Sequence, residues 1–152
     1  MEMEGMVHAL EEIQRLLKPD GCLIDIHPIR KAPLIKIHRG SDLVFTESDP
    51  GYDYDEGLRH ADEALDEVIQ RGVFLVEGKS EFELVTHASS ATELQDYWAK
   101  YGAFDDTPKD AAVAARQNDV YARASEIMQD EIEAEISYYE RARITRLKPI
   151  SG

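Results

Sequence analysis

The sequence predicts an α+β fold of α/β derivation, with a mixed, largely antiparallel sheet of about five to six strands and about four helices. Two observations support this class. Segments with an apolar stripe at the helical period alternate with short apolar runs of strand length. Glycine-containing turns join some neighbouring runs in the manner of hairpins. The 152 residues can build one core, so we expect a single domain over residues 1–152.

The chain opens with a predicted helix, turn and strand within residues 6–29. Apolar residues recur at three- and four-residue steps up to Leu17, and charged residues occupy the opposite side. Pro19 ends the helix because the residue before a proline disfavours helical geometry. Gly21 then permits a tight turn. The apolar run Cys22–Ile26 has the length of a strand.

Two hairpins are predicted further along the chain. In each, two apolar runs of strand length flank a short segment that contains glycine and serine, residues that favour turns. The paired runs are Pro33–His38 with Leu43–Thr46, around Gly40-Ser41, and Val73–Glu77 with Phe82–Thr86, around Gly78-Lys79-Ser80.

Three further helices are predicted, each with apolar residues at helical spacing and a capping side chain at its start. Gly72 and Gly102 are placed to end the first two of them. Pro108 occupies the first turn of the third, where a missing N–H costs nothing. The helices and their caps are Tyr54–Arg71 with Asp53, Ala91–Tyr101 with Ser90 and Glu93, and Pro108–Met128 with Thr107.

The last segment, Glu131–Lys148, fits two periodicities. Its apolar residues fall on alternate positions, as in a strand, while a subset of them also fits a helix. Its Glu, Ala and Arg content favours a helix. We predict a strand here, on the resemblance described next.

The turn Leu17-Lys18-Pro19-Asp20-Gly21 resembles the "LKPGG" turn of class I S-adenosylmethionine (SAM)-dependent methyltransferases, particularly the type 11 group. The resemblance extends to about Leu147. It implies that residues 6–29 match the helix and fifth strand of that fold, and that the chain closes with a strand. It also implies a truncated, methyltransferase-like chain that corresponds to the C-terminal half and lacks the N-terminal, cofactor-binding half.

The glycine pattern agrees with that implication. No two of the nine glycines lie within three positions of each other, whereas a nucleotide-like cofactor needs glycines clustered at a helix start. We therefore expect no cofactor for the chain alone, and SAM only if a partner chain supplies the missing half. No motif for catalysis is found, so we assign no catalytic residue and leave the cofactor-binding residues unknown.

The candidate pocket residues are Asp25, His27, Trp98 and Tyr101. His27 follows the strand Cys22–Ile26 and should lie near its carboxyl end, where ligands gather in open α/β sheets. The simpler interpretation is a hydrogen-bonded histidine at the core boundary. Trp98 and Tyr101 belong to an aromatic side of the third helix, which is either core or the wall of a small-molecule pocket.

No metal site is predicted. None of the five histidines lies three or four positions from another histidine or from the single cysteine, Cys22. A calcium site at Asp49, Asp53, Asp55 and Glu56 is an alternative, but its spacing departs from the twelve-residue calcium loop. We interpret this acidic segment as a solvated face.

Charge and hydropathy limit the partners. The 31 acidic and 17 basic residues give a formal charge of −14, which argues against nucleic acid and against anionic membrane surfaces. The start, MEMEG, lacks the pattern of a signal peptide, and no apolar run approaches membrane-spanning length. We expect a cytoplasmic protein. The strand Cys22–Ile26 would lack a neighbour, so we expect a homodimer through that exposed edge, or a separate SAM-binding chain.

Three functions remain open at this point. The first is a methyltransferase-like protein, inactive alone, that acts in small-ligand binding or assembly. The second is half of a split SAM-dependent methyltransferase that a partner chain completes. The third is an unrelated α+β binding module, which a first strand away from the centre of the sheet would favour. Fold analogy alone cannot name a substrate.

Overall fold

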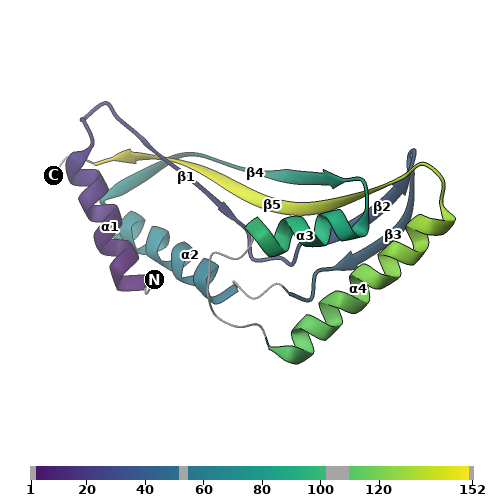
Figure 1. Cartoon of the computed structure of the whole chain (residues 1–152). Coiled ribbons are helices and arrows are strands. Elements are labelled where there is room, and N and C mark those ends of the chain that lie inside the picture. The colour runs from purple at the N-terminus through teal and green to yellow at the C-terminus, as the bar shows by residue number, and fades with distance from the viewer. Residues whose placement is uncertain (1–2, 52–54, 102–109, 151–152) are drawn as a thin grey trace. The chain divides into compact units, whose positions relative to one another are not determined.

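The computed structural model describes residues 3–51, 55–101 and 110–150, and the statements below refer to these ranges. They form an α+β fold with four helices and a five-stranded, antiparallel sheet, which confirms the predicted fold class (Figure 1). The elements are α1 (Met3–Leu16), β1 (Leu23–Pro28), β2 (Leu34–Arg39), β3 (Asp42–Ser48), α2 (Asp55–Gln70), β4 (Phe74–Ala88), α3 (Ala91–Tyr101), α4 (Ala111–Asp130) and β5 (Ala134–Pro149).

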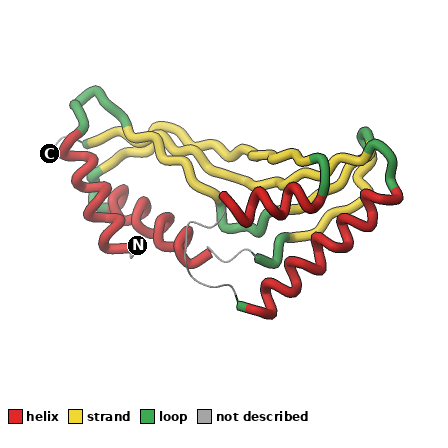
Figure 2. The backbone as a smooth tube through the Cα atoms, viewed as in Figure 1, coloured by secondary structure: helices red, strands yellow, loops and turns green. Residues whose placement is uncertain are grey.

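The long strand β5 pairs with three other strands of the sheet, β1, β2 and β4 (Figure 2). The strand order is β1-β5-β2-β3, and β4 also pairs with β5. β2 pairs with residues 134–139 of β5, and β1 pairs with residues 142–147. β1 therefore stands at one end of this order. The prediction that the last segment is a strand is confirmed.

The chain divides into two compact units. Unit 1 comprises residues 1–31, 53–83 and 141–152, and unit 2 comprises residues 32–52 and 84–140. Each unit is assembled from stretches that are far apart in the sequence. The single domain over residues 1–152 stays a prediction.

Unit 1 buries the apolar stripes of α1 and α2. The stripe of α1 follows the predicted three- and four-residue steps, and α1 packs against α2. The strands contribute Phe74 and Leu147, which are 1 % and 0 % exposed. The other buried members of this core are Val7, Ala64 and Val68.

Unit 2 has a core of its own between the β2–β5 pair and the helices α3 and α4. Ile35, Ile37 and Ile136 are fully buried on the strands, and Leu94 on α3 is fully buried as well. Alternate residues of a strand point to the same face, so Ile35 and Ile37 both reach this core. The β2–β3 hairpin agrees with the prediction, and Gly40 in its turn has a φ of 60°.

The prediction of a second hairpin is wrong, because β4 runs without a turn from Phe74 to Ala88. Gly78 takes no positive φ, and the segment that we expected to turn is extended. Long-range pairing with β5 explains the difference, since it extends the strand through a segment with weak local preference. Charge pairs between the two strands accompany this pairing, namely Glu77–Arg146 at 2.9 Å and Glu83–Arg141 at 3.8 Å.

The helix boundaries agree with most of the predicted signals. Gly72 follows α2 with a φ of 74°, as expected for a glycine that ends a helix. The hydroxyl of Ser90 accepts the backbone N–H of Glu93 at 3.0 Å, which is half of the predicted capping box. α4 begins at Ala111 with Asp110 as its N-cap. The predicted caps Asp53 and Thr107, together with Gly102 and Pro108, lie outside the described residues. No helix in the described ranges is both long and apolar enough to span a membrane.

Candidate functional site

The candidate site lies in unit 1 and begins with Asp25 and His27 on β1. They are two positions apart on a strand, so their side chains lie on the same face. Nδ1 of the His27 ring lies 2.6 Å from Oδ2 of Asp25. The register places His27 opposite Arg143 of β5, and Asp25 opposite Thr145. One face of this strand pair therefore gathers two basic side chains, one carboxylate and one hydroxyl.

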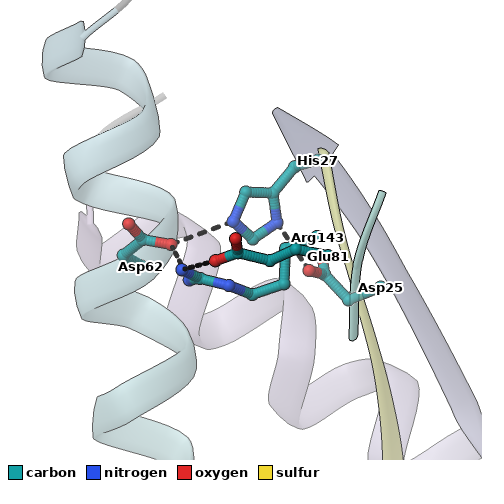
Figure 3. A network of polar contacts seen from close by, with 5 residues as sticks. All are labelled: Asp25, His27, Asp62, Glu81 and Arg143. Carbon is teal, nitrogen blue, oxygen red and sulfur yellow. Dashed lines mark hydrogen bonds and ion pairs between the residues drawn. The ribbon is translucent and has the colours of Figure 1, made fainter. Parts of the chain in front are cut away.

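The helix α2 adds a second carboxylate to His27. Oδ1 of Asp62 lies 2.9 Å from Nε2 of the ring and 3.7 Å from a guanidinium nitrogen of Arg143. Two cationic side chains directly opposite each other in a sheet would repel one another. Asp62 contacts both His27 and Arg143, so its negative charge offsets that repulsion. Figure 3 shows the ring of His27 between the carboxyl groups of Asp25 and Asp62.

Both ring nitrogens of His27 face carboxylate oxygens, which only accept hydrogen bonds when ionised. A neutral imidazole has one N–H, whereas the imidazolium has two, so this geometry selects the cation. The hydrogen bond with Asp25 is the main cause that raises the pKa of His27 above its ordinary value. The bond with Asp62 acts in the same direction, and partial burial opposes them. The side chain of His27 is 11 % exposed.

The charge network continues from Arg143 to β4. The guanidinium of Arg143 lies 3.4 Å from Glu81, and Arg141 lies 3.5 Å from the same carboxylate. Figure 3 shows the alternation of acidic and basic groups from Asp25 to Glu81. The outer pairs of this network are partly exposed, so each is worth at most about 1 kcal/mol. The pairs around His27 are less exposed than these outer pairs.

A small cavity of about 170 Å³ lies beside the network, within the same unit. The helix α2 contributes residues spaced three and four positions apart, which lie along one side of a helix. β5 contributes alternate residues of one face. The lining residues are Asp62, Leu65, Asp66 and Ile69 of α2, Val76 and Lys79 of β4, and Arg143, Thr145 and Leu147 of β5.

Some polar groups of this cavity have hydrogen-bond or ion-pair partners in the protein, and others have none among the described residues. Asp62 and Arg143 belong to the His27 network. By contrast, Asp66, Lys79 and Thr145 form no ion pair or side-chain hydrogen bond with any described residue. Thr145 is nevertheless only 4 % exposed. Among the described residues, the fully buried side-chain polar atoms without a partner are Trp98 Nε1 and the Tyr121 hydroxyl, so the Thr145 hydroxyl keeps some accessible surface. Its place on the cavity wall leaves it available to a bound molecule.

The structure brings together two of the four predicted pocket residues, Asp25 and His27. Trp98 belongs to unit 2, where its ring packs against that of Tyr138 at a centroid distance of 4.6 Å. This contact agrees with the core interpretation of the aromatic side of α3. The side chain of Tyr101 lies outside the described residues.

The other members of the site could not be found from sequence motifs. Asp62 lies 35 positions from His27, and Arg143 and Glu81 come from two further strands. The sequence carried one weak signal: Asp62 and Asp66 lie four positions apart, so their carboxylates are on the same side of an amphipathic helix. That pattern is common on solvated helices, so it does not distinguish a site.

Unit 2 contains a separate buried carboxylate, Asp49, which is 6 % exposed. It accepts the hydroxyl of Tyr138 at 2.5 Å, the side-chain amide of Gln117 at 3.0 Å and the backbone N–H of Gly51 at 2.8 Å. Burial raises the pKa of the neighbouring Tyr121 hydroxyl, and the charge of Asp49 adds to that effect. These contacts join β5, α4 and the end of β3, and they indicate a structural role for Asp49.

The arrangement around His27 suits binding better than general base catalysis. A general base needs a free lone pair within reach of the proton it removes, and both nitrogens of His27 are occupied by carboxylates. Within the described ranges, no group of three or more His, Cys, Asp or Glu side chains is placed to hold a metal ion. Of the calcium alternative, Asp53 and the side chain of Asp55 lie outside the described residues.

Comparisons with known proteins give no assignment. No family model, no curated protein and no solved structure matches this chain.

Proposed function

We propose that this protein is a small-ligand-binding module without catalytic activity of its own, and that its ligand occupies the cavity of unit 1. One observation carries the proposal. Three polar groups that line the cavity, on Asp66, Lys79 and Thr145, have no partner among the described residues. Polar groups that converge on a cavity with aliphatic side chains in its wall are characteristic of ligand sites.

The size of the cavity restricts the ligand. Its volume of about 170 Å³ is below the usual range of about 300–1,000 Å³ for drug-sized ligands. A nucleotide cofactor is therefore disfavoured as an occupant, and a small metabolite fits better. The position of β1 at the end of the strand order also favours an unrelated α+β binding module over a methyltransferase remnant.

The test is amide chemical-shift mapping with ¹⁵N-labelled protein. A panel of small carboxylates, amines, amino acids, sugars and phosphates would be added at millimolar concentration. We expect at least one compound to shift the amides of α2, β4 and β5 that surround the cavity, in a saturable manner. The double variant D66N/K79Q should lose this response. The control D96N/K18Q makes the same pair of charge changes at residues that do not line the cavity and should keep the response.

Two results would contradict the proposal. One is a panel in which no compound shifts cavity amides. The other is a response that survives unchanged in D66N/K79Q, because the ligand would then bind elsewhere. Folding of each variant is checked by the dispersion of its amide spectrum.

A second candidate function is assembly through β1, either as a homodimer or with a separate SAM-binding chain. β1 ends the strand order, and Ile24 and Ile26 on its outer face are 47 % and 56 % exposed. Unpaired strand edges with exposed aliphatic residues readily pair with another chain. Light scattering of the purified chain should then give a dimer that I24T/I26T shifts to monomer, whereas the control I132T leaves it intact. A monomeric wild-type chain would exclude the homodimer.

Calorimetric titration with SAM separates the cofactor hypotheses. The methyltransferase resemblance predicts no SAM binding by the chain alone. Saturable heat would show that the cofactor binds without a glycine-rich loop. Absence of heat at about 100 μM protein would exclude a Kd tighter than about 1 mM for the chain alone.

A further inference from the structure

We infer that the ligand of the unit 1 cavity is a small zwitterion with an aliphatic side chain, of the chemical class of the aliphatic α-amino acids. The inference rests on the proposed function and specifies its ligand. It follows from the charges, the apolar wall and the size of the cavity, taken in turn below.

The charged side chains of the cavity wall are balanced in number. Two are carboxylates, Asp62 and Asp66, and two are cations, Lys79 and Arg143. One of the carboxylates, Asp62, is already paired with one of the cations, Arg143, at 3.7 Å. One carboxylate and one ammonium therefore remain to meet a ligand. Both side chains are exposed, so water solvates them in the free protein. A zwitterion can pair with both, whereas a ligand with a single charge gains only one such pair.

The two remaining charges come from different walls of the cavity. Asp66 is on α2 and Lys79 is on β4, and their charged groups are more than 4.0 Å apart because no ion pair joins them. A ligand with ammonium and carboxylate groups on one carbon can lie between them. The ammonium would donate to Asp66, and the carboxylate would accept from Lys79. The hydroxyl of Thr145 is a further donor for the carboxylate.

The rest of the wall is aliphatic. Leu65 and Ile69 of α2 face the cavity, and Val76 and Leu147 of the strands complete it. Leu147 is fully buried, whereas Val76 is 38 % exposed, so the aliphatic wall runs from the core of unit 1 to its surface. A branched aliphatic side chain placed against these residues would remove apolar surface from water, which favours its binding.

The decisive experiment compares L-leucine with two analogues that each lack one charge. 4-Methylpentanoate keeps the carboxylate and the branched chain, and 3-methylbutan-1-amine keeps the amine and the branched chain. Binding is measured by saturation of the cavity amide shifts. We expect leucine to bind at least about tenfold more tightly than either analogue, because each lost charge removes a charge-assisted hydrogen bond.

Single variants assign each charge to its partner. D66N should weaken leucine and the amine by about tenfold and leave the carboxylate unaffected. K79Q should weaken leucine and the carboxylate and leave the amine unaffected. T145V, which is nearly isosteric, should weaken leucine and the carboxylate less than K79Q does. The charge-matched controls D96N and K18Q should leave all three affinities unchanged.

The outcomes distinguish this inference from the proposed function. If an analogue binds as tightly as leucine, or if only another class of compound shifts the cavity amides, the zwitterion inference fails while the binding function stands. If no compound of any class shifts them, both fail. Selectivity for leucine that D66N and K79Q remove in the stated pattern supports both.

Discussion

Nε2 of His27 on β1 lies 2.9 Å from Oδ1 of Asp62 on α2, and Nδ1 of the same ring lies 2.6 Å from Oδ2 of Asp25. This relationship connects a strand to a helix through an imidazolium. Asp62 also lines the cavity and contacts Arg143, which lies opposite His27 in the sheet. One carboxylate thus compensates two cations and fixes one wall of the candidate ligand site.

The raised pKa of His27 predicts how stability depends on pH. A histidine whose pKa is higher in the folded state than in the unfolded state stabilises the fold fully below its unfolded pKa of about 6.5, and this contribution falls as pH rises through the folded pKa. H27Q should therefore lower the free energy of unfolding by about 1–2 kcal/mol at pH 6. The difference from wild type should shrink towards pH 9. Urea denaturation at both pH values measures it, and a difference that grows with pH would contradict the assignment.

Removal of Asp62 should destabilise the protein through both His27 and Arg143. D62N leaves the cations of His27 and Arg143 opposite each other without the carboxylate that separates them, so we expect a loss of about 1–3 kcal/mol. In the D62N background, R143Q should restore part of this loss, because it removes one of the two cations. Thermal or urea unfolding of the single and double variants gives the coupling. Purely additive effects would show that Asp62 does not link the two side chains.

Substitution of Gly78 should raise the stability of the protein, and substitution of Gly72 should lower it. Gly78 lies inside β4 without a positive φ, and an added Cβ would meet no atom within 4 Å. G78T should therefore stabilise the protein by about 0.5–1 kcal/mol, since glycine is unfavourable inside a strand. G72A should destabilise it by about 1 kcal/mol, because its φ of 74° strains a residue with a side chain. A loss of stability in G78T would instead support the hairpin predicted from the sequence.

The buried Asp49 should make unit 2 sensitive to the hydroxyl of Tyr138. Y138F removes the donor that lies 2.5 Å from the carboxylate, so we expect a loss of about 1–3 kcal/mol in the free energy of unfolding. Y139F is the matched control, because the neighbouring Tyr139 contacts Lys36 through its ring and forms no hydrogen bond with the described residues. Chemical denaturation compares the two. Equal effects would mean that the Tyr138–Asp49 contact contributes nothing specific.

Local patterns predicted most of the fold. The stripe of α1, the turn that contains Gly21, the β2–β3 hairpin and the start of α3 each depend on neighbours in the sequence, and each is present in the structure. The prediction of the second hairpin was wrong because this segment depends on a distant part of the chain rather than on its neighbours in the sequence. Residues 78–80 have weak local preference, and pairing with β5, more than 50 positions away, decides their conformation.

The candidate site was predictable only in part, for the same reason. Asp25 and His27 could be placed together because alternate strand residues share a face. Asp62, Glu81 and Arg143 reach the same place through the packing of α2 and the register of β4 and β5, which the sequence alone does not specify. Trp98 was chosen for its aromatic character, and that character serves the core of unit 2 instead.

The most direct test of this account is the protonation state of His27, because the imidazolium connects Asp25 to the wall of the cavity. Two-dimensional ¹H–¹⁵N spectra of the histidine side chains, recorded at pH 7.5 on wild type and assigned with H27Q, report whether each ring nitrogen carries a proton. We predict that both nitrogens of His27 are protonated, and that D62N lowers the pKa of His27 towards its ordinary value. A neutral ring at pH 7.5, with one unprotonated nitrogen, would contradict the paired-carboxylate network on which the site is built.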